Sequence, residues 1–248
     1  MENTLSLTRR RALSLGVATL ASPIIKARAE TNLPVLVELF TSQGCSSCPA
    51  ADKLAETLKA DTGATVVSFN VDYWDYLGWR DTLAKPEYTQ RQMDYAKSRG
   101  DNDVYTPQMI IDGDHHAVGS NQAQVTNAIA AAYKTQSKVP MSIKANDTEL
   151  IVELGEGIAT PEATLWLMAV APTVAVKIER GENAGHEITY QNVVRKLVPA
   201  GIWNGKSAKL TFPRKSIITG DVKSCLAVLQ KGKVGQVLGL AEWNVEGV

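Results

Sequence analysis

Blocks of apolar and polar residues predict a strand–helix–strand unit near the start of this chain. Residues 33–40 form an apolar run typical of a buried strand. Residues 50–58 then place small and apolar side chains at helical spacing. Residues 65–71 are rich in β-branched and apolar side chains, which favours a second strand. A parallel strand pair joined by a helix is therefore expected here.

The pattern continues with further helices and a hairpin. Residues 86–98 read as a helix that starts at a proline and stops before Gly100. The dipeptide Asp112-Gly113 predicts a tight turn that pairs residues 108–111 with residues 116–118. A helix over 121–134 follows. We therefore expect an α/β domain over residues 30–138.

From residue 141 the pattern changes to short alternating strands separated by turn residues. Such a series predicts an antiparallel, all-β, sandwich-like domain over residues 139–248. The expected strand segments are 141–145, 149–154, 165–170, 174–178, 188–198, 208–212, 225–230 and 234–240.

The first residues read as an export signal rather than as part of the fold. Arg9, Arg10 and Arg11 precede a short apolar stretch, and residues 27–29 form a small-x-small cleavage site. Adjacent arginines favour the twin-arginine route, with the general secretory route as the alternative. We expect residues 1–29 to be removed near Ala29 and the mature protein to be periplasmic or secreted. No later stretch is long and apolar enough to span a bilayer, so no membrane insertion of the mature form is expected.

Composition narrows the choice of partners. The chain has 248 residues, 44% of them hydrophobic, and a formal net charge of zero. That balance gives no reason to expect a nucleic-acid partner. It leaves the oligomeric state open.

Cys45 and Cys48 are separated by two residues and lie at the junction between the first strand and the helix that follows it. Unpaired backbone N–H groups and the helix dipole favour a thiolate there. Such surroundings can lower a cysteine pKa from roughly 8.5 to about 3.5–7.5. Cys45 is then the expected attacking sulfur, and Cys48 the sulfur that resolves a mixed disulfide. Acting alone, this pair needs no cofactor beyond its own disulfide.

Two other roles for the pair stay open. A static disulfide would clip the start of the helix, although so short a loop gains little from closure. A metal site is the other, in which the two cysteines hold copper or zinc together with His115 or His116. Adjacent residues of a strand point to opposite faces, so at most one histidine would turn inward.

Several further residues are candidates for substrate binding or for the core. Trp74 and Trp79 lie in the segment that follows the carboxyl end of the second strand. They would either line one side of a substrate site or pack against the core. Residues 180–186 read as a polar turn that would help bind substrate if it reached the thiols. Cys225 lies in an apolar strand and reads as a buried core thiol.

The element order, the C-x-x-C motif and the Thr106-Pro107 dipeptide ahead of the hairpin resemble the thioredoxin fold. Residues 40–49, followed by residues 71–79, are similar to a family of exported bacterial proteins catalogued as domain of unknown function 1223. That similarity covers nearly all of the mature chain. It implies a thioredoxin-like domain over residues 30–138 and no established activity.

The resemblance also suggests roles for individual residues. Cys45 and Cys48 match the redox pair, and Pro107 matches a cis-proline that orients the substrate backbone together with Thr106. Glu38 corresponds to a buried acid that assists proton transfer at the second cysteine, with a spacing one residue longer than in thioredoxin.

Two functions are therefore carried forward. The first is thiol–disulfide exchange with a protein or small thiol through a mixed disulfide. The sequence does not specify whether the protein would act as oxidant, reductant or isomerase. The alternative is a non-enzymatic protein that binds and delivers copper or zinc through the same cysteines.

Overall fold

A computed structural model describes residue 1 and residues 34–135, 138–158 and 162–245. The predicted export signal falls almost wholly on residues 2–33, outside the described part. No helix among the described residues has both the length and the apolar character needed to cross a bilayer.

The first half of the chain alternates strands and helices, as its hydrophobic pattern predicts. Its elements are β1 (Leu36–Thr41), α1 (Pro49–Thr62), β2 (Thr65–Asn70), the short 3-10 helix η1 (Asp75–Leu77), α2 (Pro86–Arg99), β3 (Gln108–Ile111), β4 (His115–Val118) and α3 (Gln122–Thr135).

The second half is mostly strand. Its elements are β5 (Met141–Ala145), β6 (Glu149–Leu154), β7 (Ala163–Lys177), β8 (Glu187–Trp203), β9 (Ala208–Pro213), the single-turn helix α4 (Arg214–Ile217), β10 (Ser224–Lys231) and β11 (Val237–Asn244).

One long hairpin differs from the sequence prediction. The segments 165–170 and 174–178 were expected as two strands, but β7 runs through both. It stays paired with β8 from Ala163↔Trp203 to Lys177↔Glu187, so each strand supports the other along its whole length. The result is an arm that extends past the neighbouring strands.

Most of the described strands belong to one mixed sheet. Its order is β11-β10-β7-β8-β2-β1-β3-β4, and a second sheet has the order β5-β6-β9. The two halves of the chain join where β2 pairs with β8 in parallel at Ser68↔Val193. The structure is thus mixed α/β with a large sheet, and four strands of the second half extend the sheet of the first half instead of forming a separate one.

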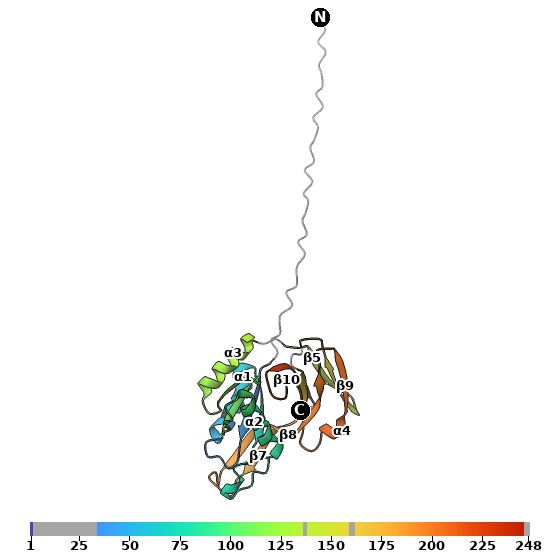
Figure 1. Ribbon diagram of the computed structural model, residues 1–248. Helices are drawn as coiled ribbons and strands as arrows, with labels where there is room; N and C mark the ends of the chain where they lie inside the picture. The colour runs from blue at the N-terminus through green and yellow to red at the C-terminus, as the bar shows by residue number, and fades with distance from the viewer. Residues whose placement is uncertain (2–33, 136–137, 159–161, 246–248) are drawn as a thin grey trace. The chain divides into compact units, whose positions relative to one another are not determined.

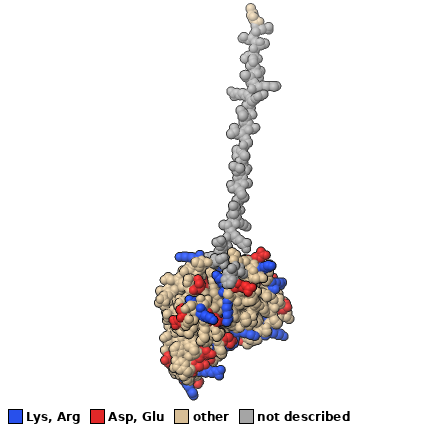
Figure 2. Space-filling view, viewed as in Figure 1, with Lys and Arg blue, Asp and Glu red and all other residues tan. Residues whose placement is uncertain are grey.

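The helices and the smaller sheet cover this large sheet in layers (Figure 1). Helices α1 and α3 pack on one face of β1 and β3 through a core that includes Val37, Leu58 and Ile129. Helix α2 covers the opposite face, where Phe40 and Tyr88 are buried. Strands β5 and β6 pack against β7 and β10 through a third core. Acidic and basic side chains are interspersed over the face seen in Figure 2.

The topology brings three chain segments to one edge of the sheet. Strands β1 and β2 are parallel, so the segments that follow both leave at the same edge. Strand β3 is antiparallel to β1 and pairs Gln108 with Phe40, which places the segment preceding β3 at that edge too. The C-x-x-C loop, the Trp74 segment and Thr106-Pro107 therefore meet.

Candidate disulfide site

The two cysteines of the C-x-x-C motif form a disulfide at the start of α1. The Cα atoms of Cys45 and Cys48 are 5.4 Å apart. Cys48 is the N-cap residue of the helix, and Pro49 occupies the first turn, where a missing N–H costs nothing. The Cys48 amide donates to the carbonyl of Cys45 at 3.1 Å, which closes the turn between the two sulfurs. The motif therefore lies where helix-terminal N–H groups would favour a thiolate.

The Thr106–Pro107 segment lies beside the first turn of α1. The peptide bond between these residues is cis, as the resemblance implies. A Cβ atom added to Gly119 would lie 3.1 Å from the Cβ of Ala51 and 3.2 Å from that of Pro107, so Gly119 bridges the helix and the proline. The Pro107 carbonyl accepts a bond from the Gly119 amide at 2.9 Å.

Trp74 lies next to the disulfide loop. Its indole N–H donates to the Thr106 hydroxyl at 2.8 Å. A Cβ atom on Gly44, the residue before the first cysteine, would come within 2.9 Å of the Trp74 Cβ, so glycine permits this close approach. The ring stacks at 6.4 Å on Tyr76, which is 77% exposed. The Trp74 ring is also half-buried and packs against the core that includes Phe40 and Tyr88, so its position fits both predicted roles.

Trp79 also contacts this loop and packs against the core that includes Ile178 and Tyr190. Its indole N–H donates to the side-chain oxygen of Gln43 at 2.8 Å. The Gln43 amide nitrogen of the backbone donates to the Asp81 carboxylate at 2.8 Å. The segment 79–84 thus fixes the residues just before Cys45, and the sequence pattern gave no sign of this role for Gln43.

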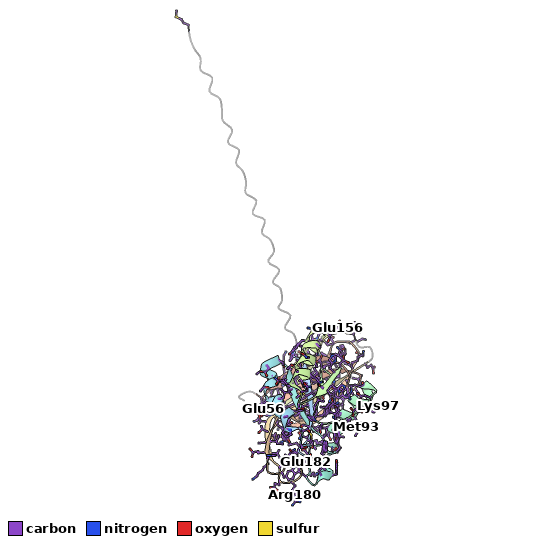
Figure 3. The ribbon with its side chains drawn as sticks, turned by 90° about the vertical axis from the view of Figure 1, so that its left-hand side faces the viewer. Glu56, Met93, Lys97, Glu156, Arg180 and Glu182 are labelled. Atoms are coloured by element: carbon purple, nitrogen blue, oxygen red, sulfur yellow. A yellow bond between two sulfur atoms is a disulfide. The ribbon has the colours of Figure 1, made fainter. Side chains whose placement is uncertain are left out.

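The tip of the β7–β8 arm covers the disulfide loop. The side-chain amide of Asn183 donates to the carbonyls of Gln43 at 2.9 Å and Cys45 at 3.0 Å. The Glu182 carboxylate accepts a bond from the Ser46 amide at 3.3 Å. Figure 3 shows Glu182 beside Arg180 at the end of the molecule away from Glu156. The polar turn read from residues 180–186 therefore does reach the thiol site, and Asn183 is a site residue that the sequence pattern did not single out.

Access to the sulfurs is restricted in this arrangement. Cys45 is 2% exposed and Cys48 is fully buried, whereas the two serines between them lie at the surface. A partner thiol can reach Cys45 only if part of the covering moves. The hydrogen bonds of Asn183 and Glu182 hold the tip of the arm on the loop.

Glu38, the predicted proton-transfer acid, points away from α1. Alternate residues of β1 face opposite sides of the sheet, and Glu38 shares the α2 face with Phe40. Its carboxylate accepts bonds from Arg91 at 2.5 and 2.9 Å and from the Tyr95 hydroxyl at 2.5 Å. Burial alone would lower the pKa of Arg91, but the Glu38 carboxylate more than offsets this and raises it. The Glu38–Arg91 pair is thus a buried structural ion pair on the other face of the sheet from the disulfide helix.

A different acid lies one helical turn after the second cysteine. Asp52 is 2% exposed, and its amide donates to the Cys48 carbonyl at 3.0 Å. Burial raises the pKa of Asp52 to about 8, the facing Thr41 hydroxyl lowers it, and the charge of Asp81 raises it further. The sequence signal for this residue was its i, i+4 spacing from Cys48, which places both on one helix face.

The histidines proposed for a metal site lie elsewhere on the sheet. His115 pairs with Ile111 and His116 with Ile110, toward the amino end of β1 rather than the disulfide end. Both histidines are exposed, and the Tyr105 hydroxyl lies 3.0 Å from His116 Nδ1. Across the described ranges, no three His, Cys, Asp or Glu side chains group in a way that could hold a metal ion.

Cys225, the third cysteine, takes no part in the site. It is free and buried in β10, as its apolar context predicts. Burial raises the pKa of its thiol to about 12, which leaves it protonated and unreactive at neutral pH.

These features define a class: mixed α/β proteins with a C-x-x-C disulfide at a strand-to-helix junction. Within that class, the chain belongs to the family described as protein of unknown function (DUF1223), whose model matches residues 36–230. No curated protein matches the chain.

Two solved structures are similar to this fold. The crystal structure of protein AGR_C_4864 from Agrobacterium tumefaciens has a TM-score of 0.76 and is 29% identical. The match covers 86% of this chain and 95% of that one. HBP35 of Porphyromonas gingivalis has a TM-score of 0.55 at 12% identity, with 87% of this chain and 76% of that chain covered. This second likeness concerns the fold alone.

Proposed function

We propose that this protein carries out thiol–disulfide exchange with a partner protein or small thiol through Cys45 and Cys48. The observation that carries the proposal is a disulfide at a helix N-terminus that faces a cis-proline segment. A pair placed there can be opened by attack on the first sulfur and closed again by the second. A short structural clip would not need Pro107 and Trp74 arranged around it.

The exchange balances without any added cofactor. A partner thiolate attacks the Cys45 sulfur, the Cys45–Cys48 bond breaks, and Cys48 leaves with the electron pair and takes a proton. A second partner thiol, as its thiolate, then attacks the partner sulfur of the mixed disulfide and releases Cys45 as a thiolate. The partner leaves as a disulfide and the protein as a dithiol. The reverse sequence reduces a partner disulfide.

The fold that we propose for this function is a thioredoxin-like domain over residues 30–138 and a sandwich-like domain over residues 139–248, the two sharing the large sheet. The order β1-α1-β2-α2-β3-β4-α3 and the cis Thr106–Pro107 bond support the first part. The packing of β5 and β6 against β7 and β10 supports the second. We also propose that residues 1–29 are an export signal and that the mature protein functions in an oxidising compartment.

Substrate would bind along the aromatic wall and the proline segment. Trp74 and the exposed Tyr76 offer stacked rings beside the disulfide, and the Thr106 hydroxyl fixes the indole. Aromatic faces of this kind bind apolar side chains of a peptide well. An extended peptide backbone lying along Thr106 and Pro107 would present its sulfur to Cys45.

Exchange also requires the β7–β8 arm to yield. Two Asn183 bonds and one Glu182 bond hold its tip over the loop. Each of these hydrogen bonds contributes only about 1 kcal/mol net, so the contact between the arm and the loop can open readily. The covering would protect the pair from unselective thiols and give way to a partner that binds the arm.

Turnover of insulin and of glutathione disulfide tests the proposal. Wild-type protein is expected to cycle, Cys45→Ser to lose turnover, and Cys48→Ala to accumulate a mixed disulfide visible by mass spectrometry. Cys225→Ala is the matched control, because its buried thiol lies outside the site, and it should retain turnover. Stoichiometric binding of copper or zinc by the reduced protein, without turnover of either substrate, would replace this proposal with metal binding.

A further inference from the structure

A cluster of buried polar side chains lies behind the disulfide. Its members come from the ends of β1 and β2, from α1, from the segment after η1 and from β8. We call it the buried acid cluster, and it consists of Thr41, Asp52, Asn70, Asp81 and Tyr190. The register of the parallel strands pairs Thr41 with Asn70, and the charges of both aspartates act on Tyr190.

The two acids of the cluster are held very differently. Asp81 accepts four bonds at 2.8–3.1 Å, from the backbone amides of residues 43, 83 and 84 and from the side chain of Asn70. Asp52 has no partner for either carboxylate oxygen among the described side chains. The Thr41 hydroxyl faces it but completes no bond of ordinary geometry, and the hydroxyl of Tyr190 is likewise unpartnered.

Burial without donors favours the neutral acid. A carboxylate in such a place would lack the hydrogen bonds that a buried charge requires. Burial raises the pKa of Asp52 to about 8, and burial also raises the pKa of Asp81, although its four donors oppose the rise. Asp52 is therefore mostly protonated at neutral pH but able to ionise in a mildly alkaline range.

Helix α1 brings this acid close to the second sulfur. Cys48 and Asp52 are one turn apart, and residues at i and i+4 lie about 5–6 Å apart at their Cβ atoms. Both are buried on the same side of the helix as Ala55. The titratable groups close enough to interact with Asp52 are Asp81 and Tyr190, and Cys48 lies one turn before it on the same helix. Cys48 is the member of this set whose proton must come and go in the exchange.

We propose that the carboxyl of Asp52 exchanges a proton with the sulfur of Cys48 each time the disulfide opens or closes. This inference rests on the proposed function and assigns it a proton-transfer residue. On opening, the Cys45–Cys48 bond breaks, Cys48 leaves with the electron pair, and neutral Asp52 supplies the proton. On closing, ionised Asp52 takes the Cys48 proton while that sulfur attacks Cys45 and expels the partner thiolate. Asp52, rather than Glu38, thereby serves the second cysteine.

The two directions should depend on pH in opposite ways. Opening is assisted while Asp52 is protonated, so its advantage is lost above about pH 8. Closing is assisted once Asp52 is ionised, so its advantage is lost below that pH. A merely structural Asp52 could change the rates with pH through its charge, but its ionised form would then slow closing rather than assist it, because a nearby carboxylate disfavours the Cys48 thiolate.

The kinetic experiment compares wild type with Asp52→Asn from pH 6 to pH 10. Opening is followed with dithiothreitol and closing with oxidised glutathione, by acid quench and mass spectrometry of trapped thiols. The ratio of wild-type to variant rate cancels the ionisation of the reagents. We expect a ratio of at least about tenfold in the favoured range of each direction, which is the low end of what positioned acids and bases contribute. Asp61→Asn, an exposed site on the same helix, should match wild type throughout.

The outcomes separate this inference from the proposed function. Exchange that proceeds with a ratio independent of pH overturns the role of Asp52 and leaves exchange standing. A carbon-13 titration of the Asp52 carboxyl in wild-type protein covers the cases in which the variant does not fold or no exchange occurs. A pKa that differs between the disulfide form and the chemically reduced form supports coupling to Cys48, and identical pKa values in the two forms overturn it.

Discussion

Replacing Asp52 by asparagine should change how the stability of the folded protein depends on pH. The unfolded side chain ionises near 3.8, whereas burial holds the folded pKa at about 8. Between these values the folded state keeps a proton that the unfolded state has lost, so the free energy of unfolding falls as pH rises. Each pH unit inside the window costs about 1.4 kcal/mol. From pH 5 to pH 7 the wild type should therefore lose about 2–3 kcal/mol through this one group.

Urea unfolding with the disulfide intact measures the effect, with the free energy of unfolding taken by linear extrapolation at each pH from 4 to 9. Asparagine fills the same space and does not titrate, so the difference between variant and wild type should grow through the window and level off above pH 8. Asp81 and the Asp112–Lys138 pair are present in both proteins and largely cancel in that difference. Asp61→Asn should show no such trend. A difference that stays constant from pH 5 to pH 8 would refute a buried, unpartnered Asp52.

Three further predictions concern the surroundings of the site. Asn183→Ala should speed reduction of the disulfide by a phosphine reductant by about thirtyfold, because it removes two bonds of about 1 kcal/mol each that hold the arm closed. Arg180→Ala, on the exposed end of the same arm, should leave the rate unchanged, and equal rates for both variants would show that the arm does not limit access. Glu38→Ala should lower the free energy of unfolding by about 3–5 kcal/mol, because the buried Arg91 charge loses its partner. The pH dependence of the exchange rates should persist in this variant. If that pH dependence is lost, Glu38 is the proton-transfer acid after all. Thr106→Val should raise the KM for a peptide substrate severalfold with less effect on glutathione, since the indole of Trp74 loses its acceptor; equal effects on both substrates would argue against a peptide-binding wall.

Local periodicity was sufficient to predict the strands and α-helices of the first half, although not the short 3-10 helix η1. The helices and strands between residues 34 and 135 follow from apolar spacing, from proline at the starts of α1 and α2, and from glycine after their ends. The disulfide at the junction of β1 and α1 also follows from local sequence. These signals involve residues that are close in the sequence, so they can be read from one sequence alone.

Long-range pairing is what the sequence did not reveal. Strand β8 joins β2 across 125 residues at Ser68↔Val193, and no local pattern marks such a choice of partner. The same pairing carries the arm over the C-x-x-C loop, and Asn183 became recognisable as a site residue only through its bonds to the carbonyls of residues 43 and 45.

The proposed transfer of the proton-relay role from Glu38 to Asp52 has a simple geometric basis. Side chains alternate across a strand, so one extra residue between the acid and the cysteines turns the acid to the other face. The longer spacing before Cys45 is visible in the sequence. Only the positions of Arg91 and α1 in the structure show that this spacing turns Glu38 to the face opposite α1.

The reduction potential of the Cys45–Cys48 pair tests the central claim most directly. The protein would be equilibrated in a series of dithiothreitol and glutathione redox buffers, with the fraction of dithiol determined by alkylation and mass spectrometry. The account predicts full, reversible interconversion with a midpoint above about −300 mV, the range of pairs that take part in exchange. A pair that stays oxidised throughout the series, or a midpoint below that value, would identify a structural disulfide and contradict the account.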